Sequence, residues 1–434
     1  MESGFEASPP YAEDCLTLNI WTPSTKTGAK LPVVIWIHGG GLLYGSNSVP
    51  IYNGAELAKK GIVFVGINYR LGIPGFLALP SLSAESPNHA SGNYGLQDDI
   101  AALKWVQANI AAFGGDPSKV TIAGQSGGAR SVNALLFSPL AKGLFRGAIA
   151  ESGIPWVLPA VQNALPTLAQ AEKGGSSVAD ALGTPDLTRF RALPAAKILD
   201  TTPAEMIGGA RSIFRGGPNV DGYVLAKEPS EAVNEAPIND VPVLMGHNGD
   251  EGDVRRPISN VISRSELEQH AKQVYGAAAP KLLGLYLSSS NDPGRAWRAS
   301  GHDRVMFGEY DWAYRRTAHA RSPVYTYDFT HVMPGYTAKD WGSFHNSEIP
   351  YWTENLDRLA ARPWTKADRE ISATMSAYWI NFIKTGNPNG SGLAEWKPCS
   401  TSAATVMELG DHPHMRPIAG ASATDFFKEF YGTH

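Results

Sequence analysis

Three features are scarce in this sequence: cysteine, excess charge of one sign and long apolar runs. Cys15 and Cys399 are the only cysteines in 434 residues, which excludes a disulfide framework, and neither has a neighbour at zinc-ligand spacing. Lysine and arginine number 37 against 41 aspartates and glutamates, a formal net charge of −4. The basic residues are scattered, so nothing indicates a nucleic acid or an anionic membrane as partner. We expect a small-molecule ligand, no metal and no cofactor.

No apolar run is long enough to span a bilayer. Residues 2–6 lack the basic start and apolar core of a signal peptide. These absences predict a soluble chain and leave open its compartment, secreted or cytoplasmic, and its oligomeric state. Hydrophobic residues make up 43% and charged residues 18% of the chain, a composition typical of a globular protein with a sizeable core. We expect a single domain over residues 1–434.

Short apolar runs alternate with helical patterns along the chain. Runs at 33–37, 62–67 and 120–123 are rich in valine and isoleucine, which is typical of buried parallel strands. Between the second and third runs, apolar residues recur at three- and four-residue spacing over 96–110, as in an amphipathic crossover helix. Further strands are predicted at 147–150, 241–245 and 324–329, and closing helices near 366–384 and 423–431. The sequence therefore predicts an α/β fold with a mostly parallel central sheet flanked by helices.

Two long stretches interrupt this rhythm, at about 153–239 and 252–322. Both mix helical patterns with glycine, proline and serine breaks. Because ligands of open α/β sheets bind at the carboxyl edge of the strands, we expect these stretches to be helical insertions over that edge. There they would wall a substrate gorge and set its specificity.

Ser126 lies in a glycine-rich turn between a predicted strand and a predicted helix. Residues 124–128 read Gly-Gln-Ser-Gly-Gly, the arrangement of a nucleophile elbow, whose tight turn leaves no room for flanking side chains. Such a turn would aim the hydroxyl of Ser126 into the cleft above the sheet. Taken alone, the pattern fits a structural turn equally well. The choice between a structural turn and a nucleophile therefore depends on the surrounding motifs.

A second motif, His-Gly-Gly-Gly at 38–41, directly follows the predicted strand at 33–37. Consecutive glycines let backbone N–H groups turn into a site, where they can hold the oxyanion of a tetrahedral intermediate. The alternatives are a flexible turn or a phosphate cradle, but no Lys-Ser/Thr pair follows as a nucleotide-binding loop requires.

A serine hydroxyl needs a base and a third group that orients the base. Of 11 histidines, His345 is favoured because it lies in the loop after the late strand at 324–329. His38 is the main rival and more plausibly shapes the oxyanion turn. For the acid, Asp250 and Glu251 both follow the strand at 241–245, and periodicity does not show which side chain faces inward. Four further histidines have other expected places. His247 and His302 would line the gorge, whereas the pair His412 and His414 is expected to be solvated.

Together these motifs resemble the type-B carboxylesterase family, which includes the cholinesterases and many bacterial esterases. The resemblance runs over most of the chain. Besides the two glycine motifs, it is carried by Glu-Asp-Cys-Leu at 13–16, Asn-Tyr-Arg-Leu-Gly at 68–72, Gly-Asn-Tyr-Gly-Leu-Gln-Asp at 92–98, Phe-Gly-Gly-Asp-Pro at 113–117, Asp-Glu-Gly at 250–252, His-x-x-Glu-Ile-Pro-Tyr at 345–351 and Gly-Asn-Pro at 386–388.

The resemblance implies an α/β-hydrolase fold and a serine carboxylesterase that works through an acyl-enzyme. Residue by residue, it implies Ser126 as nucleophile, Glu251 as triad acid and His345 as base. It also implies an oxyanion hole built from Gly40, Gly41 and Gly127. Gln125, Trp341 and Phe344 are expected to contact the substrate. The alternatives are an impaired or non-enzymatic adhesion or scaffold homologue on the same fold, and an amidase or transacylase.

The sequence departs from the family pattern in several places. The chain starts almost at the Glu-Asp-Cys-Leu segment, so we expect that the usual N-terminal strands were trimmed or are lost, and that Cys15, without its usual partner, is a free thiol. Gln125 replaces the usual glutamate before the serine, which argues against choline esters because a negative charge is lost. Gly127 replaces the usual alanine and should loosen the elbow.

The substrate is the least determined part of the function. Aromatic residues that would line an apolar gorge, or equally belong to the core, are Trp156, Phe214, Phe307 and Tyr310. Arginines that would anchor an acidic acyl group, or equally be solvated, are Arg211, Arg215, Arg255, Arg256 and Arg304.

Overall fold

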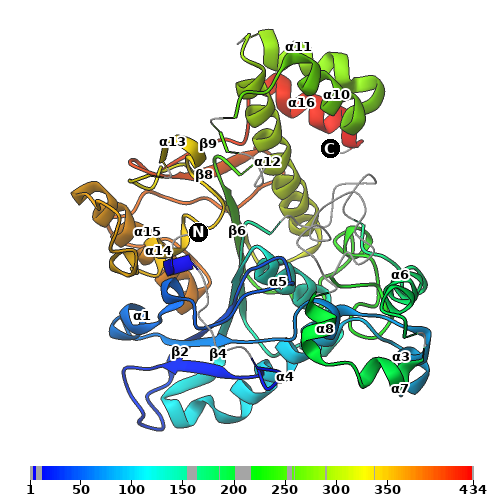
Figure 1. The fold of residues 1–434 in the computed structure, drawn as a ribbon. Helices are drawn as coiled ribbons and strands as arrows, with labels where there is room; N and C mark the ends of the chain where they lie inside the picture. The colour runs from blue at the N-terminus through cyan, green and yellow to red at the C-terminus, as the bar shows by residue number, and fades with distance from the viewer. Residues whose placement is uncertain are drawn as a thin grey trace.

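Figure 1 shows the computed structural model of the chain, built around one long twisted sheet with helices on both faces. The structure describes residues 3–5, 12–153, 164–184, 186–200, 217–251, 257–258, 260–288, 291–336 and 338–432.

The sheet has nine strands in the order β1-β3-β2-β4-β5-β6-β7-β8-β9. Their bounds are β1 Leu18–Trp21, β2 Leu31–Ile37, β3 Val63–Ile67, β4 Gly115–Gln125, β5 Gly147–Glu151, β6 Val243–Asn248, β7 Val324–Phe329, β8 Thr405–Leu409 and β9 His414–Pro417. The strands from β3 to β8 pair in parallel, whereas β1 and β9 are antiparallel to their neighbours at the two edges. The predicted mostly parallel sheet is therefore confirmed.

Strand β2 shows why the sheet is covered on both faces. Its residues 33–37 are all buried, and successive side chains of a strand point to opposite faces. Val33, Ile35 and Ile37 join one apolar cluster with α4 and α5, whereas Val34 and Trp36 join a second cluster with α14 and α15. Because both sides of the strand are packed, its sequence is an unbroken apolar run.

The helices fall into a layer on each face and groups that extend beyond the sheet (Figure 1). Their bounds in the first half are α1 Ala55–Lys59, α2 Gly72–Phe76, α3 Pro80–Glu85, α4 Tyr94–Asn109, α5 Gly127–Phe137, α6 Leu168–Ala181, α7 Leu187–Arg191 and α8 Ala195–Asp200. In the second half they are α9 Pro229–Ala232, α10 Arg264–Tyr275, α11 Ala279–Ser288, α12 Pro293–His319, α13 Ala338–Trp341, α14 Ile349–Trp352, α15 Lys366–Thr385 and α16 Ala421–Tyr431.

The two predicted insertions fall between β5 and β6 and between β6 and β7. The first contains α6 to α9. In the second, α10 and α11 gather with α16 at one end of the long helix α12 (Figure 1). Helix α12 itself packs against β6 and β7 and is buried along much of its length. The second segment thus combines inserted helices with one that covers the sheet.

Within the described residues, no helix combines the length and apolar character needed to cross a membrane. Likewise, the described part of the chain holds no group of three or more His, Cys, Asp or Glu side chains that could bind a metal ion. Cys15 and Cys399 are both free thiols.

Candidate active site

The candidate residues lie together because they follow the carboxyl ends of neighbouring strands. Strands β2, β4, β5, β6 and β7 are adjacent in the sheet. The glycine loop at 38–41 follows β2, Ser126 follows β4, Ser152 follows β5, Glu251 follows β6, and His345 lies in the segment after β7. Parallel strands end at the same edge, so residues distant in sequence converge at the edge where α/β folds bind ligands.

Ser126 has the strained backbone expected of a nucleophile elbow. Its φ of 55° and ψ of −117° lie between strand β4 and helix α5, in a region that residues with a side chain rarely occupy. Its N–H donates to the carbonyl oxygen of Glu151, 2.8 Å away. A Cβ on Gly128 would lie 1.9 Å from the carbonyl oxygen of Ile37, and one on Gly124 would lie 2.6 Å from the backbone of Gly128. The turn can therefore form only with glycine at these two positions.

The glycine loop packs directly against the start of helix α5. Gly40 and Gly41 have φ of 110° and 65°, which lets the chain turn without a steric penalty. A Cβ on Gly127 would lie 2.9 Å from the backbone nitrogen of Gly41 and 2.7 Å from that of Leu42. Glycine at 127 thus permits a close approach of the loop, which the sequence did not reveal. Among the described residues, the N–H groups of Gly40, Gly41 and Gly127 donate to no other backbone group.

Glu251 and His345 are in direct contact: a carboxylate oxygen of Glu251 meets Nδ1 of His345. The other oxygen accepts hydrogen bonds from the hydroxyl of Ser152 and the N–H of Asn248, both at 2.6 Å. Burial opposes ionisation of Glu251, but His345, His247 and the hydrogen bond from Ser152 outweigh it and lower its pKa to about 2. Glu251 is therefore a carboxylate at neutral pH. A neutral imidazole that donates its Nδ1–H to this carboxylate has its Nε2 free to accept a hydrogen bond.

Asp250 has a different place from its neighbour. Its carboxylate accepts the backbone N–H of Ser343 at 2.9 Å, and its own N–H donates to the carbonyl oxygen of Ser343 at 3.0 Å. The side-chain amide of Asn248 donates to the carbonyl oxygen of Phe344 at 2.7 Å. These bonds tie the loop that carries His345 to the end of β6.

The hydroxyl of Ser126 has no hydrogen-bond partner among the described residues. Instead, the side-chain amide nitrogen of Gln125 lies 3.3 Å from Nε2 of His345. Gln125 is buried and directly precedes Ser126. Catalytic hydrogen bonds of ligand-free enzymes often close only when substrate binds. The structure thus brings the elbow, His345 and Glu251 to one edge of the sheet, while Gln125 contacts His345.

The other histidines considered from the sequence lie outside this arrangement. His38 is buried, stacks on Tyr69 with ring centroids 4.7 Å apart, and its Nδ1 bonds the carbonyl oxygen of Gly39 at 2.8 Å. Burial lowers its pKa to about 4 despite that hydrogen bond, so it stays neutral and holds the turn. His302 bonds Asp328 at 3.1 Å. His412 and His414 are exposed.

The predicted substrate contacts are only partly described. Gln125 lies beside His345, whereas Phe344 stacks edge-on with Phe5 at 5.9 Å and lies under the guanidinium of Arg362. Trp341 is half-buried at the end of α13. Three other predicted residues lie elsewhere: Phe307 and Tyr310 are buried in α12, and Arg304 lies near Tyr275 and Tyr431. Trp156, Phe214, Arg211, Arg215, Arg255 and Arg256 lie outside the described residues.

A buried ion pair that the sequence did not predict adjoins Glu251. His247, at the end of β6, contacts Glu309 of α12, and both side chains are almost fully buried. Burial lowers the pKa of His247, but Glu309 and Glu251 outweigh it and raise the pKa to about 9. His247 is therefore an imidazolium at neutral pH, and its charge favours the ionised form of Glu251.

The raised pKa of His247 predicts a stability that depends on pH. The stabilisation is complete below the unfolded pKa of about 6.5 and is lost as the pH rises through about 9. We expect the free energy of unfolding to fall over that window by on the order of 3 kcal/mol. The double variant His247→Gln/Glu309→Gln, which leaves no orphan charge, should show a clearly flatter pH dependence in urea unfolding. An equal slope in both proteins would show that His247 is not protonated.

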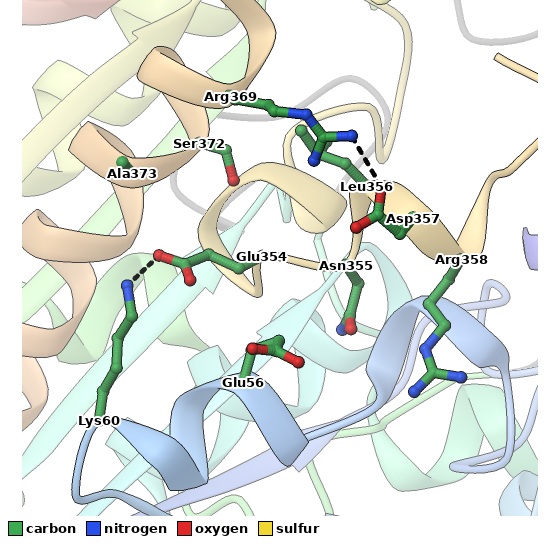
Figure 2. A pocket seen from close by; sticks show the side chains of 10 residues that line it. All are labelled: Glu56, Lys60, Glu354, Asn355, Leu356, Asp357, Arg358, Arg369, Ser372 and Ala373. Carbon is green, nitrogen blue, oxygen red and sulfur yellow. Dashed lines mark hydrogen bonds and ion pairs between the residues drawn. The ribbon is translucent and has the colours of Figure 1, made fainter. Parts of the chain in front are cut away.

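Cavity volume alone does not locate the site. A recess of about 580 Å³ lies between α1 and the segment around Glu354 and α15 (Figure 2). Its wall is polar, and Lys60 pairs with Glu354 across it while Arg369 pairs with Asp357. It contains none of the candidate catalytic residues and no glycine loop.

A mostly parallel sheet with a strained serine after one central strand, and an acid and a histidine after two others, is the arrangement of the α/β-hydrolases. A solved structure of PNB esterase matches the chain with a TM-score of 0.79 and 31% sequence identity, covering 98% of this chain and 86% of that one. The predicted fold class is confirmed.

Sequence comparisons then identify the family. The model of the carboxylesterase family matches residues 1–427. Fumonisin B1 esterase from Sphingopyxis macrogoltabida is 36% identical over 92% of this chain and 73% of its own length. Para-nitrobenzyl esterase from Bacillus subtilis is 35% identical over 88% of this chain and 76% of its own length. The chain belongs to the carboxylesterase family and is a carboxylic ester hydrolase.

Proposed function

We propose that this protein hydrolyses small-molecule carboxylic esters through an acyl-enzyme, with Ser126 as nucleophile, His345 as base and Glu251 as the acid that orients the base. The observation that carries the proposal is the contact between Glu251 and Nδ1 of His345 beside the elbow of Ser126. The backbone N–H groups of Gly40, Gly41 and Gly127, which lack other backbone partners among the described residues, are the proposed oxyanion hole.

In the first step, Nε2 of His345 takes the proton of Ser126 as the serine oxygen attacks the ester carbonyl carbon. The carbonyl electron pair moves onto its oxygen, which the three N–H groups stabilise. When the carbonyl re-forms, the alcohol leaves with the proton from His345. Water then attacks the acyl-enzyme with His345 again as base, and the acid is released as Ser126 recovers its proton.

Glu251 contributes through its charge and its position. The imidazole becomes a cation during each step, and the adjacent carboxylate stabilises that cation. Because Ser152 and Asn248 bind the other oxygen, the carboxylate is held in one orientation. Gln125 contacts Nε2 in the free protein, so its amide must give way when the Ser126 hydroxyl donates to the same atom.

Labelling with a fluorophosphonate probe tests the assembled site. We expect one phosphonyl adduct per chain, located at Ser126 by peptide mass spectrometry, because only a serine activated by a base reacts rapidly. His345→Ala should slow labelling severely. Ser177→Ala, which removes an exposed serine of α6, should label like the unchanged protein. An adduct on any other serine would contradict the assignment.

A further inference from the structure

Helix α5, which follows Ser126, is buried along its whole length except at Arg130. Arg130 is also the only charged residue of this helix. It lies one turn after the proposed nucleophile, and its N–H donates to the carbonyl oxygen of Ser126 at 3.0 Å. The one exposed point of this otherwise buried helix is therefore a guanidinium in its first turns, four residues beyond Ser126.

The guanidinium of Arg130 has no counter-ion: among the described residues it makes no ion pair and no hydrogen bond. Two other buried or half-buried arginines do have partners: Arg70 pairs with Asp98, and Arg316 donates to the carbonyl oxygen of Asn239. Burial among protein atoms lowers the pKa of Arg130, and no neighbouring carboxylate offsets that effect. The side chain is exposed, so an anion from solution can reach the unpaired guanidinium.

The surroundings of Arg130 also suit an anion. The chain after β5 crosses α5 here, since a Cβ on Gly153 would lie 2.4 Å from that of Ala129 and Gly153 accepts a hydrogen bond from Asn133. The residue before Ser126 is the neutral Gln125 where the family usually has a glutamate. Glu251 already binds His345, Ser152 and Asn248. Near Ser126 the chain therefore has an unpaired cation at Arg130, no carboxylate at residue 125, and a Glu251 carboxylate whose oxygens are already bound.

We propose that Arg130 binds a carboxylate of the substrate, so that this enzyme prefers esters that carry a free carboxylate on the acyl or the alcohol part. The proposal rests on Ser126 being the nucleophile, as argued above. A guanidinium binds a carboxylate through two parallel hydrogen bonds and so fixes its direction as well as its charge. Bound in this way, the anion supplies the counter-ion that the described chain does not.

Two pairs of esters test the preference. Mono-4-nitrophenyl glutarate is compared with 4-nitrophenyl pentanoate for an acyl carboxylate, and 4-acetoxybenzoate with 4-methylphenyl acetate for an alcohol carboxylate. The readout is the ratio of kcat/KM within each pair. In Arg130→Gln, we expect the ratio for one pair to fall by about ten- to a hundred-fold, the effect of losing charge-assisted hydrogen bonds. Arg130→Lys should retain part of it, because lysine keeps the charge without the planar fork.

A matched control and a measurement on the unchanged protein complete the test. Arg369→Gln removes an equal charge at the recess in Figure 2, where Arg369 pairs with Asp357, and should keep both ratios. If Arg130→Gln folds poorly, the salt dependence of the unchanged enzyme gives a second test. Added salt should lower kcat/KM for the carboxylated esters and leave kcat/KM for the neutral esters unaffected.

The outcomes separate this proposal from the proposed function. If both ratios are the same in Arg130→Gln and the unchanged enzyme, while Ser126→Ala lowers turnover of every ester by several orders of magnitude, Arg130 binds no substrate carboxylate and the triad assignment stands. A preference insensitive to salt would also overturn the role of Arg130. If Ser126→Ala hydrolyses these esters within tenfold of the unchanged enzyme, the proposed function itself fails.

Discussion

Replacing Ser126 by alanine should lower kcat for 4-nitrophenyl acetate by roughly a million-fold. The change removes the oxygen atom that forms the acyl bond in the proposed mechanism, so no acyl-enzyme can form. It should not disturb the fold, because the Ser126 hydroxyl makes no hydrogen bond within the described chain and the elbow is held by the backbone bond from Ser126 to Glu151. Release of 4-nitrophenolate under single-turnover and steady-state conditions measures the loss.

The residual rate is as informative as the loss. A small rate above that of water is expected from the oxyanion donors and from substrate binding. Circular dichroism and the urea midpoint should match those of the unchanged protein. Turnover within tenfold of the unchanged enzyme would mean that another residue is the nucleophile.

Replacing Glu251 by glutamine should lower kcat by about ten-thousand-fold, comparable to losing the acid of other triads. Glutamine keeps the size of the side chain but not its charge. If its amide donates to Nδ1 of His345, the proton moves to Nε2, the atom that must accept from Ser126. The imidazolium formed in each step also loses its counter-ion. Rates on 4-nitrophenyl acetate, measured over a range of pH, test both effects.

Asp250→Asn is the matched control, since it makes the same change one residue earlier. The amide oxygen of asparagine can still accept the N–H of Ser343, which Asp250 now bonds at 2.9 Å, so the loop of His345 should stay in place. We expect kcat to fall by less than about tenfold, because the change weakens only one hydrogen bond to the loop. A larger loss for Asp250→Asn than for Glu251→Gln would move the triad acid to residue 250.

Much of the fold could be predicted from the sequence because central parallel strands have a strong signal. Strand β7 was predicted with its observed bounds, Val324–Phe329, and the central part of β2 at 33–37 was recognised from its unbroken apolar run. Strands β1, β8 and β9 were not predicted. They have only four or five residues, none is buried along its whole length, and β9 contains Pro417, so their sequences lack the continuous burial that marks the centre of a sheet.

The candidate site shows where sequence patterns stop being informative. Glycine patterns located Ser126 because backbone geometry demands glycine there. The choice between Asp250 and Glu251 required the direction of side chains just past a strand end, which no periodicity encodes. The ion pair of His247, which was considered only as a possible gorge residue, and the unpaired Arg130 were missed for a related reason. A histidine ending a strand and an arginine in a helix usually have ordinary roles, and only the contacts of β6, α12 and α5 distinguish these two.

The two halves of the sheet have a consequence for how the chain acquires activity. The proposed nucleophile and oxyanion donors follow β2 and β4, whereas the acid and base follow β6 and β7. Ser126 and His345 are 219 residues apart (345 − 126), so the pair forms only when strands distant in sequence have paired in the sheet. A nascent chain or a partly folded intermediate with one half ordered would hold either a serine without its base or a base without its serine. Hydrolytic activity is thus a sensitive measure of complete folding, and a half-synthesised chain carries no risk of uncontrolled hydrolysis.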